Sequence, residues 1–216
     1  PEHYLEHLRC PACGGAELGL EEGRITCSAC GGAHSLRDGV ADLRRDPDAT
    51  GHDAADSGTW RRLNEQFLNY HRSLTPHTLL ASAPVINYVG MRTGLRDARD
   101  VRVLDVGGGT GHTLCSFFRW PETIDYYLFD PNLRLIHDQF VRVYPELLSL
   151  PMSHFLGMAE EVPFAEGTFD LVLSLSSIDH FRDYRAFMKG ASQVLKPEGR
   201  ILGSSALNHI GQTFLQ

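Results

Sequence analysis

The chain has 216 residues, 42% of them hydrophobic and 22% charged, which allows one main core with a small appendage. Its formal net charge is -7 at pH 7, and arginine pairs such as Arg44-Arg45 and Arg61-Arg62 are isolated, so the basic run typical of nucleic-acid-binding proteins is absent. RNA or DNA is therefore disfavoured as a partner, and only a local basic patch formed by folding would reverse that expectation. No apolar run approaches the roughly 18 residues of a membrane span, and the N-terminus lacks a signal-peptide pattern, so we expect a cytoplasmic protein without a membrane partner.

Two C-x-x-C motifs near the N-terminus predict a metal site. They are Cys10-Pro11-Ala12-Cys13 and Cys27-Ser28-Ala29-Cys30, and each is followed by two glycines. Four thiolates on two tight turns suit tetrahedral zinc, and a site whose four positions are all protein side chains is structural. We therefore predict structural Zn²⁺ bound by Cys10, Cys13, Cys27 and Cys30. The alternatives are His34 as fourth ligand in place of Cys30, or two disulfides in place of the metal.

Residues 1–45 are predicted to form this zinc module, which is too small to fold without the free energy of metal binding. Residues 46–58 show no apolar period and are predicted to be a linker. In residues 59–72, Trp60, Leu63, Phe67 and Tyr70 recur at helical spacing, and a second helix is predicted from Thr75-Pro76 to about residue 90.

Together, residues 59–95 are predicted to form a helical segment that precedes the main core.

The segment from Val103 to Leu114 predicts the first strand, turn and helix of a doubly wound α/β sheet. A short apolar run contains Asp105, passes through glycines, and continues into residues 111–120 with helical spacing up to Pro121. A dinucleotide fingerprint from Gly107 would need glycine at the position of His112.

The pattern that fits is D-x-G-x-G-x-G, formed by Asp105, Gly107, Gly109 and Gly111. A carboxylate two residues before the turn repels a pyrophosphate and attracts a cation. S-adenosylmethionine carries an ammonium and a sulfonium, so these four residues are predicted to bind it.

The next predicted strand, residues 124–130, ends on Asp130, twenty-five residues after Asp105. In nucleoside-binding α/β folds an acid at this place accepts hydrogen bonds from the ribose hydroxyls. Asp130 is predicted to do so, and an N-cap of the helix predicted over 132–143 is a compatible second role.

These motifs resemble motif I of the class I S-adenosylmethionine-dependent methyltransferases, and later segments extend the resemblance to about residues 85–205. The segment Phe155-Leu156-Gly157-Met158-Ala159-Glu160-Glu161-Val162-Pro163-Phe164 resembles the family's adenine-binding segment, in which an acid takes the adenine amino group. Met158 replaces that acid, so the resemblance implies that Met158 packs on the adenine ring and that the Ala159 N–H reads a ring nitrogen. Residues 195–203 resemble the Lys-Pro-x-Gly turn before the family's fifth strand.

Helices commonly cover the cofactor pocket at this place in the family, so the resemblance implies that residues 59–95 form a helical lid. Tyr70 and His71 could then reach the cofactor or the substrate, and the alternative is a core tyrosine beside a surface histidine.

Residues 167–177 are predicted to be the fourth strand, with its carboxyl end beside the methyl group to be transferred. The resemblance places Ser174 at the cofactor. The sequence Ser174-Leu175-Ser176-Ser177 differs from the Asn/Asp-Pro-Pro-aromatic motif of many methyltransferases acting on exocyclic or amide nitrogens, which argues against that class. His180, or second Asp179, is the candidate base for an acceptor that carries a proton, and helix packing is the alternative role of His180.

The predicted fold is therefore α/β, with a doubly wound, mostly parallel sheet of the class I methyltransferase type over residues 96–216. The N-terminal module resembles the zinc ribbon fused to some bacterial methyltransferases, and is similar to small stand-alone zinc proteins that activate RNA and protein methyltransferases. Because the family's sheet continues for two more strands, we expect this core to lack its last strands.

The leading functional prediction is S-adenosylmethionine-dependent methyl transfer to oxygen or carbon of a small molecule, such as a secondary metabolite. A zinc ribbon before a methyltransferase core is also the arrangement of ribosomal-RNA guanine methyltransferases, which is the first alternative. The second is a non-catalytic, methyltransferase-like partner protein. The sequence leaves the acceptor and the oligomeric state open.

Overall fold

The structure is a computed structural model that describes residues 2–45, 90–109, 111, 113–131, 133 and 151–204. None of the helices in these ranges is long and apolar enough to cross a membrane. The elements in chain order are η1 (Glu2–His7), β1 (Leu18–Glu21), β2 (Arg24–Cys27), β3 (Ala33–Arg37), β4 (Val40–Asp42), η2 (Leu95–Asp97), β5 (Arg102–Val106), α3 (Thr113–Phe117), η3 (Pro121–Thr123), β6 (Asp125–Phe129), β7 (Met152–Leu156), β8 (Phe169–Leu175), η5 (Ile178–His180), α5 (Tyr184–Val194) and β9 (Leu195–Ser204).

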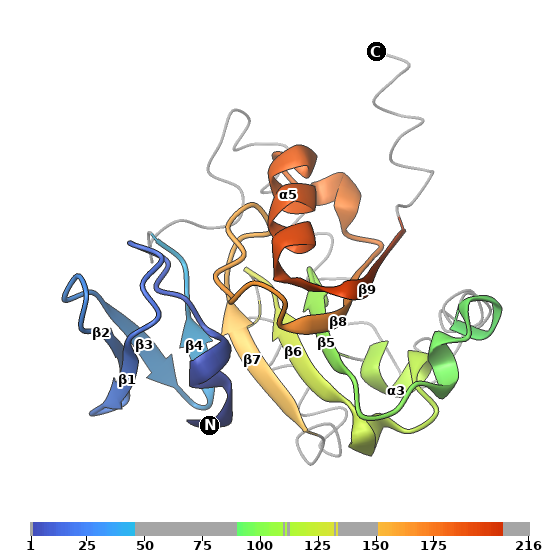
Figure 1. The fold of residues 1–216 in the computed structure, drawn as a ribbon, viewed down its shortest axis with the longest axis horizontal. Helices are drawn as coiled ribbons and strands as arrows, with labels where there is room; N and C mark the ends of the chain where they lie inside the picture. Colours follow the sequence, from blue (N-terminus) through green and yellow to red (C-terminus); the bar gives the residue numbers. More distant parts are fainter. Residues whose placement is uncertain are drawn as a thin grey trace, which may run out of the picture.

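The described strands form one sheet in the order β1-β2-β3-β4-β7-β6-β5-β8-β9 (Figure 1). Strands β1 to β4 pair antiparallel, whereas every pairing from β4 through β9 is parallel. From β5 the chain adds β6 and β7 on one side and then β8 and β9 on the other. This reversal at β5 confirms the predicted doubly wound α/β fold.

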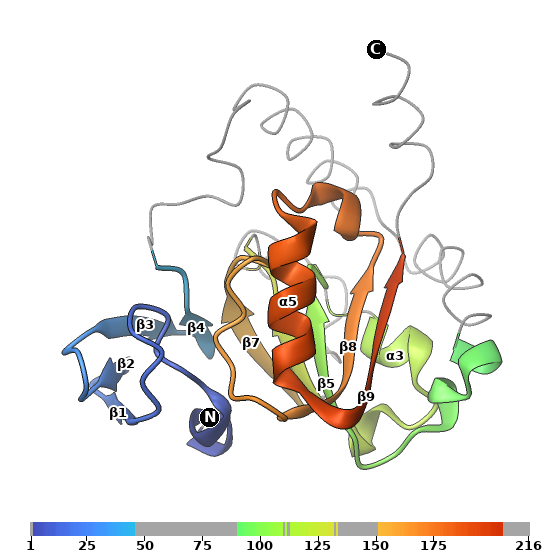
Figure 2. The same cartoon turned by 45° about the horizontal axis from the view of Figure 1, so that its top comes forward.

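Alternating side chains along β5 supply two apolar layers. Leu104 belongs to the cluster that α5 covers with Phe187, and Val103 belongs to the cluster that α3 covers with Leu114. Figures 1 and 2 show α5 and α3 on opposite sides of the sheet. Because successive residues of a strand point to opposite faces, Asp105 shares the α3 face with Val103.

The N-terminal module is joined to the core as part of the same sheet. Its strand β4 pairs parallel with β7, with Val40 opposite His154 and Asp42 opposite Leu156. The N–H of Leu43 then donates to the carbonyl of Leu156 at 2.8 Å. An open strand edge is a site for unwanted pairing, and here β4 covers the β7 edge of the core.

A second contact joins the start of the chain to the segment before β8. Leu8 forms an antiparallel bridge with Phe164, and the N–H of Arg9 donates to the carbonyl of Pro163 at 2.9 Å. Tyr4 meets the ring of Phe155 edge-on, with the ring centroids 5.0 Å apart. These residues of the module and the core therefore belong to one apolar cluster.

Several predicted elements differ from the observed ones in their bounds or lie outside the described residues. The helix predicted over 111–120 is the shorter α3. The Lys-Pro-x-Gly turn forms a bulge in β9, since Phe169 pairs with Leu195 but Leu171 pairs with Arg200. The predicted linker, both lid helices with Tyr70 and His71, and nearly all of the helix predicted over 132–143 lie outside the described residues.

The shared cluster makes a stability prediction. Leu8→Ala should lower the free energy of unfolding by about 2–5 kcal/mol, because Leu8 has no exposed surface and its cavity would open between module and core. Urea denaturation followed by tryptophan fluorescence and circular dichroism should show one transition with both probes. Glu21→Ala, at an exposed residue of β1, is the control that should change stability little. Separate transitions for the two probes would contradict a shared core.

Candidate functional site

The turn between β5 and α3 has a backbone that requires glycine. Gly107, Gly109 and Gly111 have φ values of 71°, 55° and 71°, a left-handed region that other residues adopt only with strain. The N–H of Gly107 donates to the carbonyl of Phe129 at 2.8 Å, which fixes the turn against the end of β6.

Gly108 is required because there is no space for a side chain, and it lies at a position that the D-x-G-x-G-x-G pattern leaves open. A side chain there would collide with the carboxylate of Asp105, and its Cβ would lie 2.5 Å from Cδ1 of Leu128. A Cβ on Gly107 would lie 2.6 Å from Cβ of Ser177. The ends of β5, β6 and β8 therefore converge on the turn and leave no room for side chains at Gly107 and Gly108. In the sequence, the run of adjacent glycines was the feature that could have indicated this crowding.

Asp105 is a buried acid aimed at this turn. It has no exposed surface, and the hydroxyl of Tyr126 donates to its Oδ2. Its Oδ1 has no hydrogen-bond partner among the residues the structure describes. Burial, with the nearby charge of Asp130, raises the pKa of Asp105 to about 7, although hydrogen bonds from Tyr126 and Thr113 oppose the rise. Such a group is stabilised by a cationic or hydrogen-bond-donating ligand.

Tyr126 is a site residue that the sequence analysis missed. Its ring lies in the buried β6, where a phenol needs a hydrogen-bond partner, and Asp105 supplies one. A tyrosine in an otherwise apolar strand was the signal that could have identified it.

Asp130 lies at the end of β6 and is 6% exposed. Its Oδ2 accepts a hydrogen bond from the N–H of Gly109 at 3.0 Å, and its own N–H donates to the carbonyl of Phe155 at 3.1 Å. The structure therefore places Asp105 and Asp130 both against the glycine turn.

The predicted adenine-binding residues follow β7. Gly157 allows close packing here, because a side chain at that position would collide with the ring of Phe129. Met158 is partly exposed, Ala159 is buried, and the N–H of Glu161 donates to the carbonyl of Met158 at 2.9 Å to close a turn. Met158 and Ala159 thus lie at the carboxyl end of β7, beside the end of β6.

The carboxyl end of β8 bends against the glycine turn. Ser174 has no exposed surface, and its hydroxyl has no hydrogen-bond partner within the described ranges. Ser176 adopts a φ of 58°, which is strained for a serine. The hydroxyl of Ser177 donates to the carbonyl of Gly107 at 2.9 Å, which ties this bend to the turn.

The two candidate catalytic side chains lie next to each other on η5, directly after this bend. Nε2 of His180 is 3.9 Å from Oδ2 of Asp179, and the two side chains are 34% and 9% exposed. Neither carboxylate oxygen of Asp179 has a hydrogen-bond partner among the described side chains and backbone. The Asp179 carboxylate is nearly buried, so it can stabilise a protonated His180 imidazole and can accept a hydrogen bond from a ligand.

The sequence-predicted site residues of the core therefore meet at one edge of the sheet, where β5, β6, β7 and β8 end. In open α/β sheets this is the edge that binds ligands, at the point where the strand order reverses. Tyr70, the one predicted cofactor contact from the lid, lies outside the described residues.

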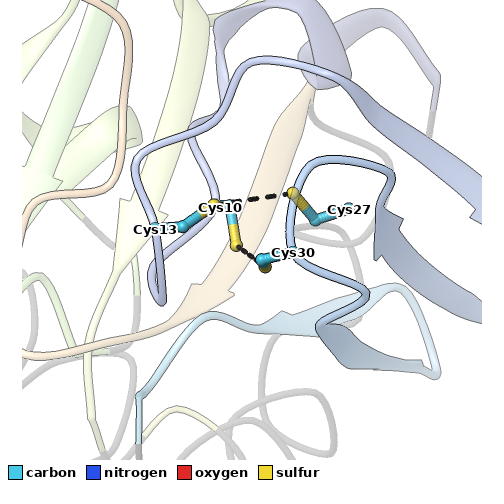
Figure 3. A group of neighbouring side chains, drawn as sticks. All are labelled: Cys10, Cys13, Cys27 and Cys30. Carbon is cyan, nitrogen blue, oxygen red and sulfur yellow. Dashed lines mark hydrogen bonds between the residues drawn. The ribbon is translucent and has the colours of Figure 1, made fainter.

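A second site lies in the N-terminal module, where four thiols meet (Figure 3). The sulfurs of Cys10, Cys13, Cys27 and Cys30 all lie within 4.8 Å of one another. Those of Cys10 and Cys30 are 3.6 Å apart and those of Cys13 and Cys27 are 3.7 Å apart, so both pairs are far beyond disulfide bonding distance. Four sulfurs at about 2.3 Å from zinc in a tetrahedron would be about 3.8 Å apart, so the donor set fits that metal.

Both C-x-x-C loops have the same backbone hydrogen bonds. The first cysteine's N–H donates to the carbonyl of the second glycine, Gly15 or Gly32, and the first glycine's N–H donates back to that cysteine's carbonyl. Burial of the Cys27 thiol opposes ionisation, but the N–H groups of Cys30 and Ala29 lower the pKa of Cys27 to about 7. Backbone geometry thus favours a thiolate at Cys27, the form that binds metal.

The crowding at the glycine turn gives a test that is independent of any ligand. Gly108→Ala should lower the free energy of unfolding by about 1–3 kcal/mol, since the new Cβ would displace Asp105 or Leu128. Gly19→Ala is the matched control, because its Cβ would meet only Oγ1 of Thr26 at 3.6 Å. Urea denaturation of the two variants measures the difference, and equal stabilities would contradict the observed convergence.

The comparisons with known proteins agree with this geometry. The family described as methyltransferase domain matches residues 48–214. The chain is 31% identical over 125 residues to erythromycin 3''-O-methyltransferase of Saccharopolyspora erythraea, covering 55% of this chain and 38% of that protein. It is 30% identical over 105 residues to the ubiquinone/menaquinone biosynthesis C-methyltransferase UbiE of Proteus mirabilis, covering 48% of this chain and 42% of that protein. Each match thus spans less than half the length of the relative.

A solved structure shares the fold. It is that of a Methanococcus maripaludis protein assigned as an S-adenosyl-L-methionine-dependent methyltransferase, with a TM-score of 0.50 at 14% identity over 64% of this chain and 65% of that chain. The family match covers well over half of the sequence and includes every core strand of the doubly wound sheet. The chain belongs to the class I S-adenosylmethionine-dependent methyltransferases.

Proposed function

We propose that this methyltransferase transfers the methyl group to oxygen or carbon of a small-molecule acceptor. The observation that carries the proposal is the end of β8, where Ser176 and Ser177 bend against the glycine turn and bring Asp179 and His180 to the same sheet edge as Asp105. The serine sequence there lacks the motif of many nitrogen-directed enzymes. Two relatives named for O-methylation and for C-methylation support the same classes.

The cofactor-binding residues are proposed from their positions around the glycine turn. Oδ1 of Asp105 is placed to accept from the cofactor's ammonium, and Asp130, anchored by the N–H of Gly109, is placed to accept from the ribose hydroxyls. Met158 and Ala159 would hold the adenine, and the Ser174 hydroxyl, unpartnered within the described part of the chain, would bond to the cofactor. The site fits the group because Oδ1 of the buried Asp105 has no hydrogen-bond partner among the described residues, and an ammonium would supply one.

When bound, S-adenosylmethionine supplies an electrophilic methyl group on a sulfonium. The protein's task is to align the acceptor and exclude water. His180 would take the acceptor's proton as general base, and the Asp179 carboxylate 3.9 Å away would stabilise the resulting imidazolium. The strained Ser176 directs the chain into this position.

The acceptor class is tested by transfer of an isotopically labelled methyl group from S-adenosylmethionine to a panel of hydroxylated and phenolic small molecules, with total RNA offered in parallel. We expect label in the small-molecule fraction, and a His180→Ala variant about 10²–10⁴-fold slower with unchanged affinity for S-adenosylhomocysteine. His3→Ala, whose side chain is 61% exposed on the N-terminal module, is the matched histidine control.

Two other outcomes would replace the proposal. Label in RNA, with binding that weakens steeply as salt rises, would favour a ribosomal-RNA methyltransferase. A folded protein that binds neither S-adenosylmethionine nor S-adenosylhomocysteine would be a non-catalytic scaffold.

The buried acid makes cofactor binding pH-dependent. Below its pKa of about 7, Asp105 is protonated in the cofactor-free protein, and an ammonium beside it favours the ionised form. Binding of S-adenosylhomocysteine should therefore release about one proton at about pH 6 and close to none at about pH 8.5, as measured by calorimetry in two buffers of different ionisation enthalpy.

Asp105→Asn should abolish this proton release. Asp170→Asn should preserve the proton release, because Asp170 is already ionised by its partners. Nζ of Lys196 lies 2.8 Å from Oδ1 of Asp170. Burial acts to raise the pKa of Asp170, but the hydrogen bonds from Lys196 and Arg102 outweigh burial and lower that pKa. A wild-type enthalpy that does not depend on the buffer would show that Asp105 does not meet the ammonium.

We further propose that the four cysteines hold one structural Zn²⁺ in a zinc ribbon. Elemental analysis should find about one zinc per chain, Cys13→Ser should lose most of it, and Cys115→Ser, at the fifth cysteine, should retain it. Chelation should lower the melting temperature of the whole chain, because Leu8 and Ile25 of the module lie in the core cluster. Full stability after complete metal removal would contradict the proposal. Reduced thiols of this kind fit the cytoplasm expected from the sequence.

A further inference from the structure

The segment 157–165 links the proposed cofactor site to two neighbouring parts of the fold. On one side, the N–H of Ala165 donates to the carbonyl of His7 at 2.7 Å, and Arg9 bonds to Pro163. These bonds anchor the far end of the segment to the N-terminal module. Its near end carries Met158 and Ala159.

On the other side, the side chain of Glu160 links the segment to the start of α5. Oε1 of Glu160 accepts hydrogen bonds from the backbone N–H of Arg182 at 2.7 Å and of Asp183 at 3.3 Å. Asp183 is the N-cap of α5, where its carboxylate accepts from the N–H of Arg185 and Ala186. Glu160 therefore fixes the two residues that precede the helix, and does so from the adenine side.

The residues that Glu160 fixes continue directly from the candidate base. His180 and Asp179 lie on η5, whose other end is tied to the glycine turn by the hydroxyl of Ser177. The stretch from residue 177 to 183 is thus held at two points. One point is the turn that the cofactor's methionine end would cover, and the other is Glu160, one residue from Ala159.

We infer that Glu160 is a positioning residue that couples occupation of the adenine site to the placement of Asp179 and His180. The inference rests on the proposed cofactor contacts of Met158 and Ala159. A ligand that orders residues 158–159 also orders Glu160, and Glu160 then fixes the backbone at residues 182–183 that follows the base. Cofactor binding would in this way prepare the acceptor side of the site before the acceptor arrives.

The neighbouring Glu161 provides a matched control. Its carboxylate lies 3.6 Å from Nε of Arg45, and the two side chains are 39% and 63% exposed. It is the adjacent acid on the same segment, and its ion pair is with Arg45 of the N-terminal module. Removing Glu161 should leave the coupling intact.

The test is hydrogen–deuterium exchange of the full-length, zinc-loaded protein with and without saturating S-adenosylhomocysteine. In the wild type, the ligand should slow amide exchange about tenfold both in residues 157–165 and in residues 177–183. In Glu160→Ala the slowing should persist at 157–165 and fall below about twofold at 177–183. Glu160→Gln retains a side-chain carbonyl that can accept both N–H groups, so it should behave as the wild type, whereas Glu160→Asp is too short and should behave as alanine.

Each outcome is assigned in advance. Wild-type slowing at 157–165 without any at 177–183, or equal slowing in Glu160→Ala and the wild type, would overturn the coupling and leave the proposed cofactor site standing. A ligand that binds without slowing exchange at 157–165 would instead overturn the proposed adenine contacts. Loss of coupling in Glu161→Ala as well as in Glu160→Ala would show a general loosening of the segment and would also overturn a specific role of Glu160. Because the wild-type comparison needs no variant, the test survives a variant that does not fold.

Discussion

The close approach of three strand ends at one glycine turn constrains the rest of the core. Gly107 and Gly108 have no space for a side chain, because Ser177 comes from one side and Asp105 and Leu128 from the other. The order of β6, β5 and β8 in the sheet brings Leu128 and Ser177 to the turn, although both are distant from it in sequence. A change in the packing of any of these strands would therefore be transmitted to the turn.

The site combines two unlike electrostatic situations at that edge. Asp105 is wholly buried, with its pKa raised, and it lies beside a phenol and an apolar layer. Asp179 is nearly buried after the bend, and Nε2 of its titratable neighbour His180 lies 3.9 Å from its Oδ2. One acid is thus suited to a ligand's positive charge, and the other to a proton that moves during reaction.

Much of this arrangement could be predicted from sequence because its signals are local. The apolar runs that end on Asp105 and Asp130 became β5 and β6, and the four C-x-x-C cysteines came together. The pairing of β4 with β7 could not be predicted, since a three-residue strand carries no period and its partner is more than 100 residues away. The contacts of Tyr126 and Glu160 could not be predicted for a related reason. Each side chain bonds to a segment that is distant in sequence, and only the folded structure brings the two together.

The β4–β7 pairing also has a consequence for how the chain is made. During synthesis the N-terminal module emerges from the ribosome long before β7. Until then, the backbone groups on the β7-facing edge of β4 lack their strand partner. If the four cysteines capture metal at that stage, the preformed β4 offers a ready template on which β7, and then the remaining parallel strands, can align. Metal supply in the cell would then govern the yield of nascent chains that mature correctly, in addition to the stability of those already finished.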